Sequence, residues 1–534
     1  MESVTLTQGG LPTILRYGAE VSRGHSRLET SHPPKQRKPM EVSQNRRTEC
    51  WNWRRNYEVC SGSVYNRNSS ANYLHEDRSE TKKSKMQEEL SQATRPVKTT
   101  PDVNCFFFST MLEEILDYRN VQKAMKQVIS NHGAGGMDNM QTDELRVYLE
   151  ANWALLKQSI LEGNYRARPV RRVDIRKAQG GTRMLGIPTV LDRLFHQAVA
   201  QWLSPQYEPE FSAYSYGFRE GRNAHQAVLQ AKKYLDEGKE WIIELDLEKF
   251  FDKVNHDKLM GLLAKRIGDK RTLKLIRSFL NSGIMEGGMV SQRTEGTPQG
   301  SPLSPLLSNI MLHELDKELQ ERGHSFVRYA DDCSIYVKSE KSAHRVMESI
   351  TNYIEGKLKL KVNRGKTKVS RPHQSTLLAF SFYQNRGEWK IRIAPKAVER
   401  VKEKLRDKTK RNDPSRAEDK IKKLEAVARG WVNYFSIATA TSVMRQLDEM
   451  VRIRLRMGIW KQWKRSKTKI RNLVRLGVSR GKAYKWGNSS LGYCRIAHSP
   501  ILGIALNNKY LQSLGYVGFY NYYYWKTKHQ LKLF

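Results

Sequence analysis

Apolar residues recur at helical spacing in two stretches of the second hundred residues. Over 111–129 they stand three and four positions apart, which predicts an amphipathic helix. The glycine-rich segment NHGAGGMD at 131–138 is typical of a loop. The stretch 142–163 opens with Thr142 at an N-cap position and Glu144 in the first turn, then returns to helical spacing. We therefore expect two helices joined by a glycine-rich loop.

Strand patterns appear in the middle of the chain and alternate irregularly with helical ones. The segment WIIELDLEKFFDKVNHDKL at 241–259 begins as an apolar strand and ends with helical spacing. GTPQGSPLSPLLSNIMLHELDKELQERG at 296–323 predicts a turn and then a long helix. FVRYADDCSIYV at 326–337 predicts a hairpin of two short strands that meet at Asp331 and Asp332. Such an order indicates an α+β fold rather than a doubly wound parallel sheet.

The two ends of the chain differ from its middle. Residues 1–105 are polar and basic without a sustained period, and we expect a disordered extension because little apolar surface can be buried there. The stretch 395–480 is helical in pattern and carries 25 Lys and Arg against 9 Asp and Glu, a net charge of +16. The tail 481–534 is rich in aromatic residues.

The charge of the whole chain points to a polyanionic partner. Its 93 Lys and Arg against 55 Asp and Glu give a formal net charge of +38. A solubilising surface needs only about 2–8 net charges on a small domain. No apolar run approaches the ~18 residues of a membrane-spanning helix, and no basic amphipathic anchor stands out. We therefore expect nucleic acid, and no membrane, as the partner.

The cysteines argue against a disulfide scaffold or a zinc ribbon. There are five, widely spaced, with no C-x-x-C pair. We expect a reducing, intracellular setting, and the start of the chain lacks the apolar region of a signal peptide.

Three aspartates form the candidate chemistry. An adjacent pair such as Asp331 and Asp332 is by itself most often a solvated turn. Asp246, however, ends a strand that is too apolar for a surface edge, and burying a carboxylate without a partner costs several kcal/mol. Converging carboxylates need a cation, and hard oxygen ligands select Mg²⁺. Two such ions about 4 Å apart stabilise the attacking and leaving oxygens of an in-line displacement, which suits phosphodiester synthesis.

Several motifs in fixed order carry a family resemblance. YADD, LDLEKFFDKVNHDKL, GTPQGSPLSPLLSNIMLHELD, LKVNRGKTKVS and GIPTVLDRLFHQAV match the blocks of reverse transcriptases, with NHGAGGMD upstream and ARGWVNYF downstream. From about residue 110 onward the chain resembles a group II intron-encoded reverse transcriptase/maturase, and 459–502 is similar to the bacterial class C subgroup. The resemblance implies a right-hand polymerase. Its expected parts are fingers and palm over 106–390, a helical thumb/maturase domain (domain X) over 391–480 and a nucleic-acid-binding segment over 481–534.

The resemblance also assigns the catalytic residues. Asp246, Asp331 and Asp332 are expected to be catalytic and to hold two Mg²⁺ ions, together with the carbonyl of Leu247. Phe250 is expected to exclude the ribose 2′-hydroxyl, although Phe250 and Phe251 also fit as plain core residues.

Further residues are expected to bind the incoming nucleotide. Gln299 lines the pocket by resemblance, with an ordinary turn as the alternative, and Lys366 lies in the next block. Arg171 and Lys177 match cations that hold the triphosphate, on a hairpin that turns at 179–181. Here the sequence departs from the family pattern I-P-K-P and reads IRKA instead. The GKT that contains Lys366 is not a P-loop, because the required earlier glycine is absent.

The basic helical region is expected to bind RNA. Cations that contact phosphates make such binding salt-dependent. Trp460 and Trp463 are candidates for stacking on unpaired bases, whereas Trp431 and Tyr434 fit better as helix-packing core. The expected RNA-binding cations are Lys461, Lys464, Arg465, Lys467, Lys469 and Arg471.

The expected function follows from these parts. The resemblance implies an RNA-directed DNA polymerase that binds its group II intron RNA and assists splicing and retrohoming by target-primed reverse transcription. Its partners would be intron RNA, an RNA template with a DNA primer, dNTPs and target DNA, in the bacterial cytoplasm and at the nucleoid. No HNH endonuclease cluster appears near the end of the chain, so we expect the protein to lack its own second-strand nuclease. Two alternatives stay open: a domesticated reverse transcriptase in phage defence or spacer acquisition, and an RNA-binding splicing factor with an idle polymerase.

Overall fold

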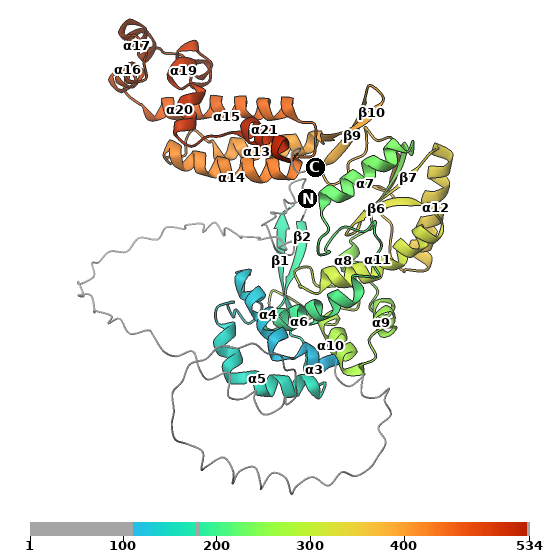
Figure 1. Ribbon diagram of the computed structural model, residues 1–534. Coiled ribbons are helices and arrows are strands. Elements are labelled where there is room, and N and C mark those ends of the chain that lie inside the picture. The colour runs from blue at the N-terminus through green and yellow to red at the C-terminus, as the bar shows by residue number, and fades with distance from the viewer. Residues whose placement is uncertain (1–110, 177–181, 531–534) are drawn as a thin grey trace, which may run out of the picture.

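The computed structural model describes residues 111–176 and 182–530. The predicted extension over 1–105 and the predicted triphosphate ligand Lys177 lie outside these residues. A mixed body of helices and strands is followed by a helical C-terminal part (Figure 1). The predicted α+β fold with an all-α C-terminal part is confirmed.

Three helices open the described part, and a break near Asp117 separates the first two. The prediction of one helix over 111–129 is therefore wrong. Asp117 has an extended ψ of 144°, and its side chain accepts a hydrogen bond from the Arg119 N–H at 2.8 Å, which starts a new helix. The third helix begins at Leu145, so the predicted N-cap Thr142 lies outside it. These helices are α3 (Met111–Ile115), α4 (Tyr118–Ser130) and α5 (Leu145–Leu161).

A first sheet, next to these helices, has the strand order β2-β1-β4-β5. Strands β1 and β2 form the predicted antiparallel hairpin, and β4 runs parallel to β1. Helix α6 (Val190–Tyr207) follows β2, and the Thr189 hydroxyl caps it by accepting the Asp192 N–H at 3.1 Å. The strands are β1 (Val170–Arg176), β2 (Thr182–Ile187), β4 (Ile284–Glu286) and β5 (Met289–Ser291).

A second sheet forms the centre of the molecule and has the order β6-β7-β3-β8. Strands β6 and β7 make the predicted hairpin, with Tyr329 paired to Asp332, so that Ala330 and Asp331 form the turn. Strand β3 pairs antiparallel with both β7 and β8. These strands are β3 (Trp241–Leu245), β6 (Ser325–Tyr329), β7 (Asp332–Val337) and β8 (Lys368–Ser370).

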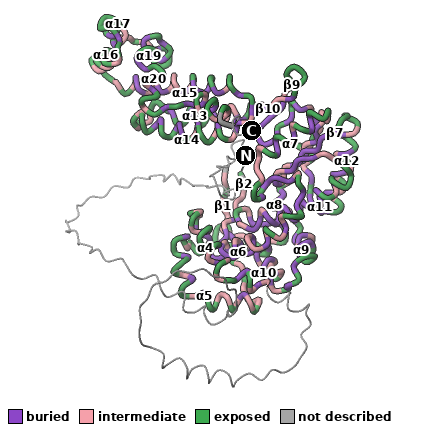
Figure 2. Tube along the Cα trace, viewed as in Figure 1, coloured by how far each residue is buried: buried purple, intermediate pink, exposed green. Residues whose placement is uncertain are grey.

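Helices cover both faces of this second sheet. Alternate residues of a strand point to opposite faces, and here both faces are buried. Ile243, Ile335 and Phe326 pack into one core with α11 and α12, whereas Ile242 and Tyr336 pack into another with α7 and the C-terminal helices. Figure 2 shows buried residues along the strands and the inner sides of the helices. The helices of this region are α7 (Ala224–Asp236), α8 (Phe250–Lys253), α9 (His256–Ala264), α10 (Lys270–Leu280), α11 (Ser304–Glu321) and α12 (Glu340–Gly356).

The C-terminal part begins with an antiparallel hairpin and continues as helices. Its last helix, α21, returns to pack on α14 and α15, while α16 and α17 lie at the far end of this part (Figure 1). No helix in the described ranges is long and apolar enough to span a membrane. The elements are β9 (Phe380–Asn385), β10 (Glu388–Ile393), α13 (Pro395–Lys408), α14 (Ala417–Phe435), α15 (Thr441–Gln462), α16 (Ser466–Arg475), α17 (Arg480–Gly487), α18 (Tyr493–Ala497), α19 (Pro500–Ala505), α20 (Asn508–Ser513) and α21 (Phe519–Gln530).

Candidate active site

The strand register brings two of the predicted aspartates face to face. Strands β3 and β7 are paired up to Leu245 and Cys333, so the next position along the same register sets Asp246 opposite Asp332. Because side chains alternate between the two faces of a strand, both aspartates point toward the face of the sheet that α7 and the C-terminal helices cover. Asp331 stands beside them in the turn.

The carboxylates of Asp331 and Asp246 act on the protonation of Asp332. Burial, followed by the neighbouring carboxylates of Asp331 and Asp246, raises the pKa of Asp332 to about 7. The positive charge of Lys366 acts in the opposite direction. Its Nζ lies 3.4 Å from Asp246 Oδ2. The three aspartates and Lys366 therefore share one electrostatic site.

The backbone next to Asp246 is held in place by a neighbouring segment. The Asp246 carbonyl accepts the Asn363 N–H at 2.8 Å, and the Glu248 N–H donates to the Lys361 carbonyl at 2.8 Å. Leu247 is thereby bridged to Val362. In this kind of antiparallel pair the central residue directs its own N–H and C=O away from the partner strand. The Leu247 carbonyl thus points away from 361–363, toward the β7 side of the strand.

The donor set fits divalent ions with hard ligands. In the described parts of the chain, no group of three or more His, Cys, Asp and Glu side chains is gathered tightly enough to hold a metal ion as it stands. The ammonium group of Lys366 beside Asp246 shows that the site accommodates positive charge. Carboxylate oxygens with one carbonyl are the ligands that Mg²⁺ prefers.

The predicted nucleotide-binding residues near α8 differ in how deeply they are buried. Phe250 is 2% exposed and belongs to the core, whereas the adjacent ring of Phe251 is half-buried. A ring so deeply buried presents no face to a sugar, so the burial of Phe250 does not fit its predicted role. Gln299 is half-buried, and its amide donates to Asp252 Oδ1 at 2.9 Å. No pattern in the sequence indicated Asp252 as the group that orients Gln299.

A second cation accompanies Arg171. Arg171 lies on β1, paired with Ile187, and its buried Nε has no hydrogen-bond partner among the described residues. Its charge lowers the pKa of Arg193, after desolvation, which is the larger cause. Arg193 donates to the Ala134 carbonyl at 2.7 Å and so anchors the glycine-rich loop at 131–138. Arg193 was not among the predicted site residues.

The predicted RNA-binding cations lie apart from the aspartates, on and before α16 (Figure 1). Lys461 Nζ donates to Asn412 Oδ1 at 2.5 Å, and Lys469 Nζ lies 4.7 Å from the ring centre of Trp460. Trp460 is 2% exposed, so the prediction that it stacks on bases is wrong, because its ring is used in helix packing. Trp463 is half-buried, and the exposed members of the cluster are Lys464, Arg465, Lys467 and Arg471.

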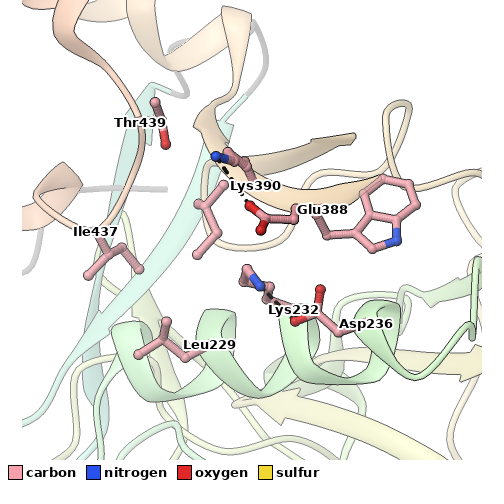
Figure 3. A pocket seen from close by; sticks show the side chains of 9 residues that line it. Leu229, Lys232, Asp236, Glu388, Lys390, Ile437 and Thr439 are labelled. Carbon is pink, nitrogen blue, oxygen red and sulfur yellow. Dashed lines mark hydrogen bonds and ion pairs between the residues drawn. The ribbon is translucent and has the colours of Figure 1, made fainter. Parts of the chain in front are cut away.

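A groove between α7 and β10 lies outside this site. Its volume is about 560 Å³, and it is bordered by ion pairs between Lys232 and Asp236 and between Lys390 and Glu388 (Figure 3). None of the predicted site residues lines it.

Comparisons with known proteins match two parts of the chain to known families. Residues 175–393 match the family "Reverse transcriptase (RNA-dependent DNA polymerase)", and residues 398–477 match the "Group II intron, maturase-specific domain". Protein YkfC of Escherichia coli (strain K12) is 34% identical over 47% of this chain and 76% of YkfC.

Two further relatives carry intron names. Group II intron-encoded protein LtrA of Lactococcus lactis subsp. cremoris is 35% identical over 45% of this chain. An uncharacterized 91 kDa protein in the cob intron of Schizosaccharomyces pombe is 39% identical over 32% of this chain. The matches span 40% of LtrA and 21% of the 91 kDa protein. The predicted resemblance is confirmed, and the chain belongs to the family of group II intron-encoded reverse transcriptase/maturases.

Proposed function

We propose that this protein copies RNA into DNA with two divalent ions held by Asp246, Asp331, Asp332 and the Leu247 carbonyl. The observation that carries the proposal is the register that sets Asp246 opposite Asp332, next to the turn with Asp331. When bound, the ions supply charge stabilisation to the attacking 3′-hydroxyl and the leaving pyrophosphate. The aspartates bring the negative charge that attracts them.

The protein's own groups position the nucleotide. Asp252 fixes the Gln299 amide, which supports a role for Gln299 at the base or sugar of the incoming nucleotide. Lys366 adds a cation next to Asp246 and would meet triphosphate oxygens.

A pair of arginines, Arg171 on β1 and Arg193 on α6, supports the binding of the triphosphate. The guanidinium groups of Arg171 and Arg193 are close enough for one charge to lower the pKa of the other. The Nε of each is buried without a hydrogen-bond partner among the described residues. We assign both, with Lys177, to the triphosphate.

The ring that excludes the ribose 2′-hydroxyl is Phe251 in this proposal, in place of Phe250. Phe251 is half-buried, and its carbonyl accepts the Thr297 N–H at 2.6 Å, two residues before Gln299. Its ring contacts that of Phe250 edge to face, with centres 5.2 Å apart. Phe250 therefore supports Phe251 from the core.

The helical part supplies the RNA-binding half of the proposal. Exposed cations before and along α16 are placed to contact the phosphates of intron RNA, and so to assist splicing and retrohoming. The partners are then intron RNA, an RNA template with a DNA primer, dNTPs and target DNA. The site of action would be the bacterial cytoplasm and nucleoid.

The test separates the two halves of this function. A variant with both Asp331→Asn and Asp332→Asn should lose primer extension on an RNA template by more than about 10³-fold, because the carboxylate ligands are gone. Its affinity for intron RNA, measured by filter binding, should stay within about twofold. The control is Glu449→Gln, a change at an exposed acid on α15.

Two results would contradict the proposal. Extension by the double Asn variant at the rate of the unchanged protein would remove the aspartates from the chemistry. A wild-type protein that binds intron RNA yet extends no primer would favour the splicing factor with an idle polymerase.

A further inference from the structure

A buried arginine holds the turn that carries Asp331. Arg328, on β6, is 0% exposed. Its Nε and Nη2 donate to the two carboxylate oxygens of Asp316 at 2.7 and 2.6 Å. Its Nη1 donates to Asn309 Oδ1 at 3.0 Å and to the Ala330 carbonyl at 2.9 Å. The carbonyl of the residue just before Asp331 is thus fixed by a side chain from inside the protein.

Helix α11 supplies both partners of this arginine. Asn309 and Asp316 are seven residues apart, two helical turns, and so lie on the same side of α11. The Asn309 amide also donates to the Gly217 carbonyl at 2.9 Å. A Cβ at Gly217 would lie 2.3 Å from the Ala330 nitrogen, so only glycine fits against the turn. The turn is therefore enclosed by α11 and by the segment around Gly217.

The enclosed residue has a strained backbone. Ala330 has a φ of 56°, in the left-handed region that residues with a Cβ rarely adopt. Such a conformation persists where the surroundings fix it. The hydrogen bond from Arg328 to the Ala330 carbonyl and the close contact with Gly217 are those surroundings.

The network acts from the opposite face of the sheet. Arg328 and Phe326 are two positions apart on β6, so their side chains lie on the same face of the sheet, where Phe326 packs with α11. The side chain of Asp332 points to the other face. Asp316, itself 0% exposed, balances the charge of Arg328. The arginine therefore acts on the turn by holding its position and not through its charge.

We propose that Arg328, Asp316 and Asn309 are positioning residues, which fix the Ala330 peptide and so set the geometry in which Asp331 and Asp332 take up divalent ions. This inference rests on the proposed function of the aspartates. It adds a role for three residues that touch neither ion nor substrate.

The test uses two variants that leave a positive charge beside Asp316. Asn309→Ala removes the contacts to Arg328 and Gly217 but leaves Arg328 bound to Asp316. Arg328→Lys keeps a positive charge beside Asp316 but cannot reproduce both Nη1 contacts. The matched control is Ser308→Ala on the same helix, because Ser308 is 2% exposed and its hydroxyl has no hydrogen-bond partner among the described residues.

Two readouts are measured at a temperature where circular dichroism shows each variant folded. Mn²⁺ binding to the protein alone, followed by electron paramagnetic resonance, should weaken about 10-fold in Asn309→Ala and in Arg328→Lys. The Mg²⁺ concentration for half-maximal primer extension should rise by a similar factor, while KM for dNTP changes less than twofold. Ser308→Ala should match the unchanged protein in both readouts.

One outcome overturns the inference. If Asn309→Ala lowers the unfolding temperature but binds Mn²⁺ with unchanged affinity, the network is only part of the core. A failure of the proposed function looks different, because the double Asn variant at Asp331 and Asp332 would then bind Mn²⁺ as tightly as the unchanged protein.

Discussion

At the scale of single residues, burial determines which of two similar neighbours is available for chemistry. Phe250 and Phe251 are identical in type and adjacent, yet one is 2% exposed and the other half-buried. Arg328 carries a full charge and is wholly buried, because Asp316 and Asn309 satisfy its donors. In both cases the surroundings of the side chain, and not its type, determine its role.

Substitution of each phenylalanine by alanine should separate these roles. Phe251→Ala should reduce the preference for dNTP over rNTP by about 10²-fold, because the ring under the sugar is removed. Phe250→Ala should leave a cavity in the core and lower the free energy of unfolding by about 3 kcal/mol. The measurements are single-nucleotide incorporation kinetics and denaturant unfolding. A loss of sugar selectivity in Phe250→Ala alone would reverse the assignment.

The residues of the site were predictable in part. The alternation around Asp331 and Asp332 predicted the hairpin. The apolar strand before Asp246 was expected not to be a surface edge, and β3 does lie between β7 and β8, but the Asp246 carboxylate was expected to be buried and is only half-buried. Local spacing could not tell Phe250 from Phe251, because a short helix of four residues has too few positions to define an inner face. Arg328 carried no local signal, since its partners on α11 become neighbours only in the folded sheet.

The bounds of helices and their places in the fold depend on contacts that the spacing of apolar residues along the chain does not reveal. The apolar stripe that predicted one helix over 111–129 continues on both sides of Asp117. The chain nevertheless forms two helices, because the Asp117 side chain accepts the Arg119 N–H and starts a new helix there. Helix α21 is held at its start by buried carboxylates of the two helices beneath it. Glu425 on α14 accepts the N–H of Val517 at 2.7 Å, and Asp448 on α15 accepts that of Phe519 at 2.7 Å.

Asp448 should therefore be essential for the docking of α21. It is 1% exposed and also accepts the Tyr516 hydroxyl at 2.8 Å and the Tyr520 N–H at 2.9 Å. Asp448→Ala leaves these donors without a partner and should lower the stability of the helical part by about 2 kcal/mol or more. Hydrogen exchange at the amides of 519–523 should become faster, which mass spectrometry can measure.

The control for this change is Glu449→Ala, at the exposed neighbour on α15. It should leave the exchange rates and the thermal unfolding of the helical part unchanged. Equal effects of the two substitutions would mean that α21 is not anchored by Asp448.

The whole molecule separates its two predicted activities in space. The aspartates lie at the central sheet, and the exposed cations lie near α16 at the far end of the C-terminal part (Figure 1). The net charge of +38 predicted a polyanionic partner, but only the fold shows that the cations before and along α16 are remote from the central sheet.

This separation predicts a selective effect of removing charge from the α16 region. Changing Lys464, Arg465, Lys467 and Arg471 to Gln should weaken binding of intron RNA. It should also reduce the slope of log affinity against log salt by about 0.7–0.9 for each phosphate that the protein no longer neutralises. Primer extension on a short template should stay within about threefold.

The comparison for this variant is the double Asn protein at Asp331 and Asp332. That protein should keep the full salt slope while extending no primer. A charge-removed variant with an unchanged slope would place the RNA-binding surface elsewhere on the molecule.

The return of α21 to α14 and α15 has a practical consequence. A fragment cut at residue 515 would keep Glu425 and Asp448 but expose the apolar socket that Phe519 fills. Expressed alone, such a piece should be insoluble, whereas the same piece supplied with a peptide of residues 516–530 regains its missing helix. The helical part is thus completed by a helix from the end of the chain. Fragments for complementation should therefore be divided just before that helix.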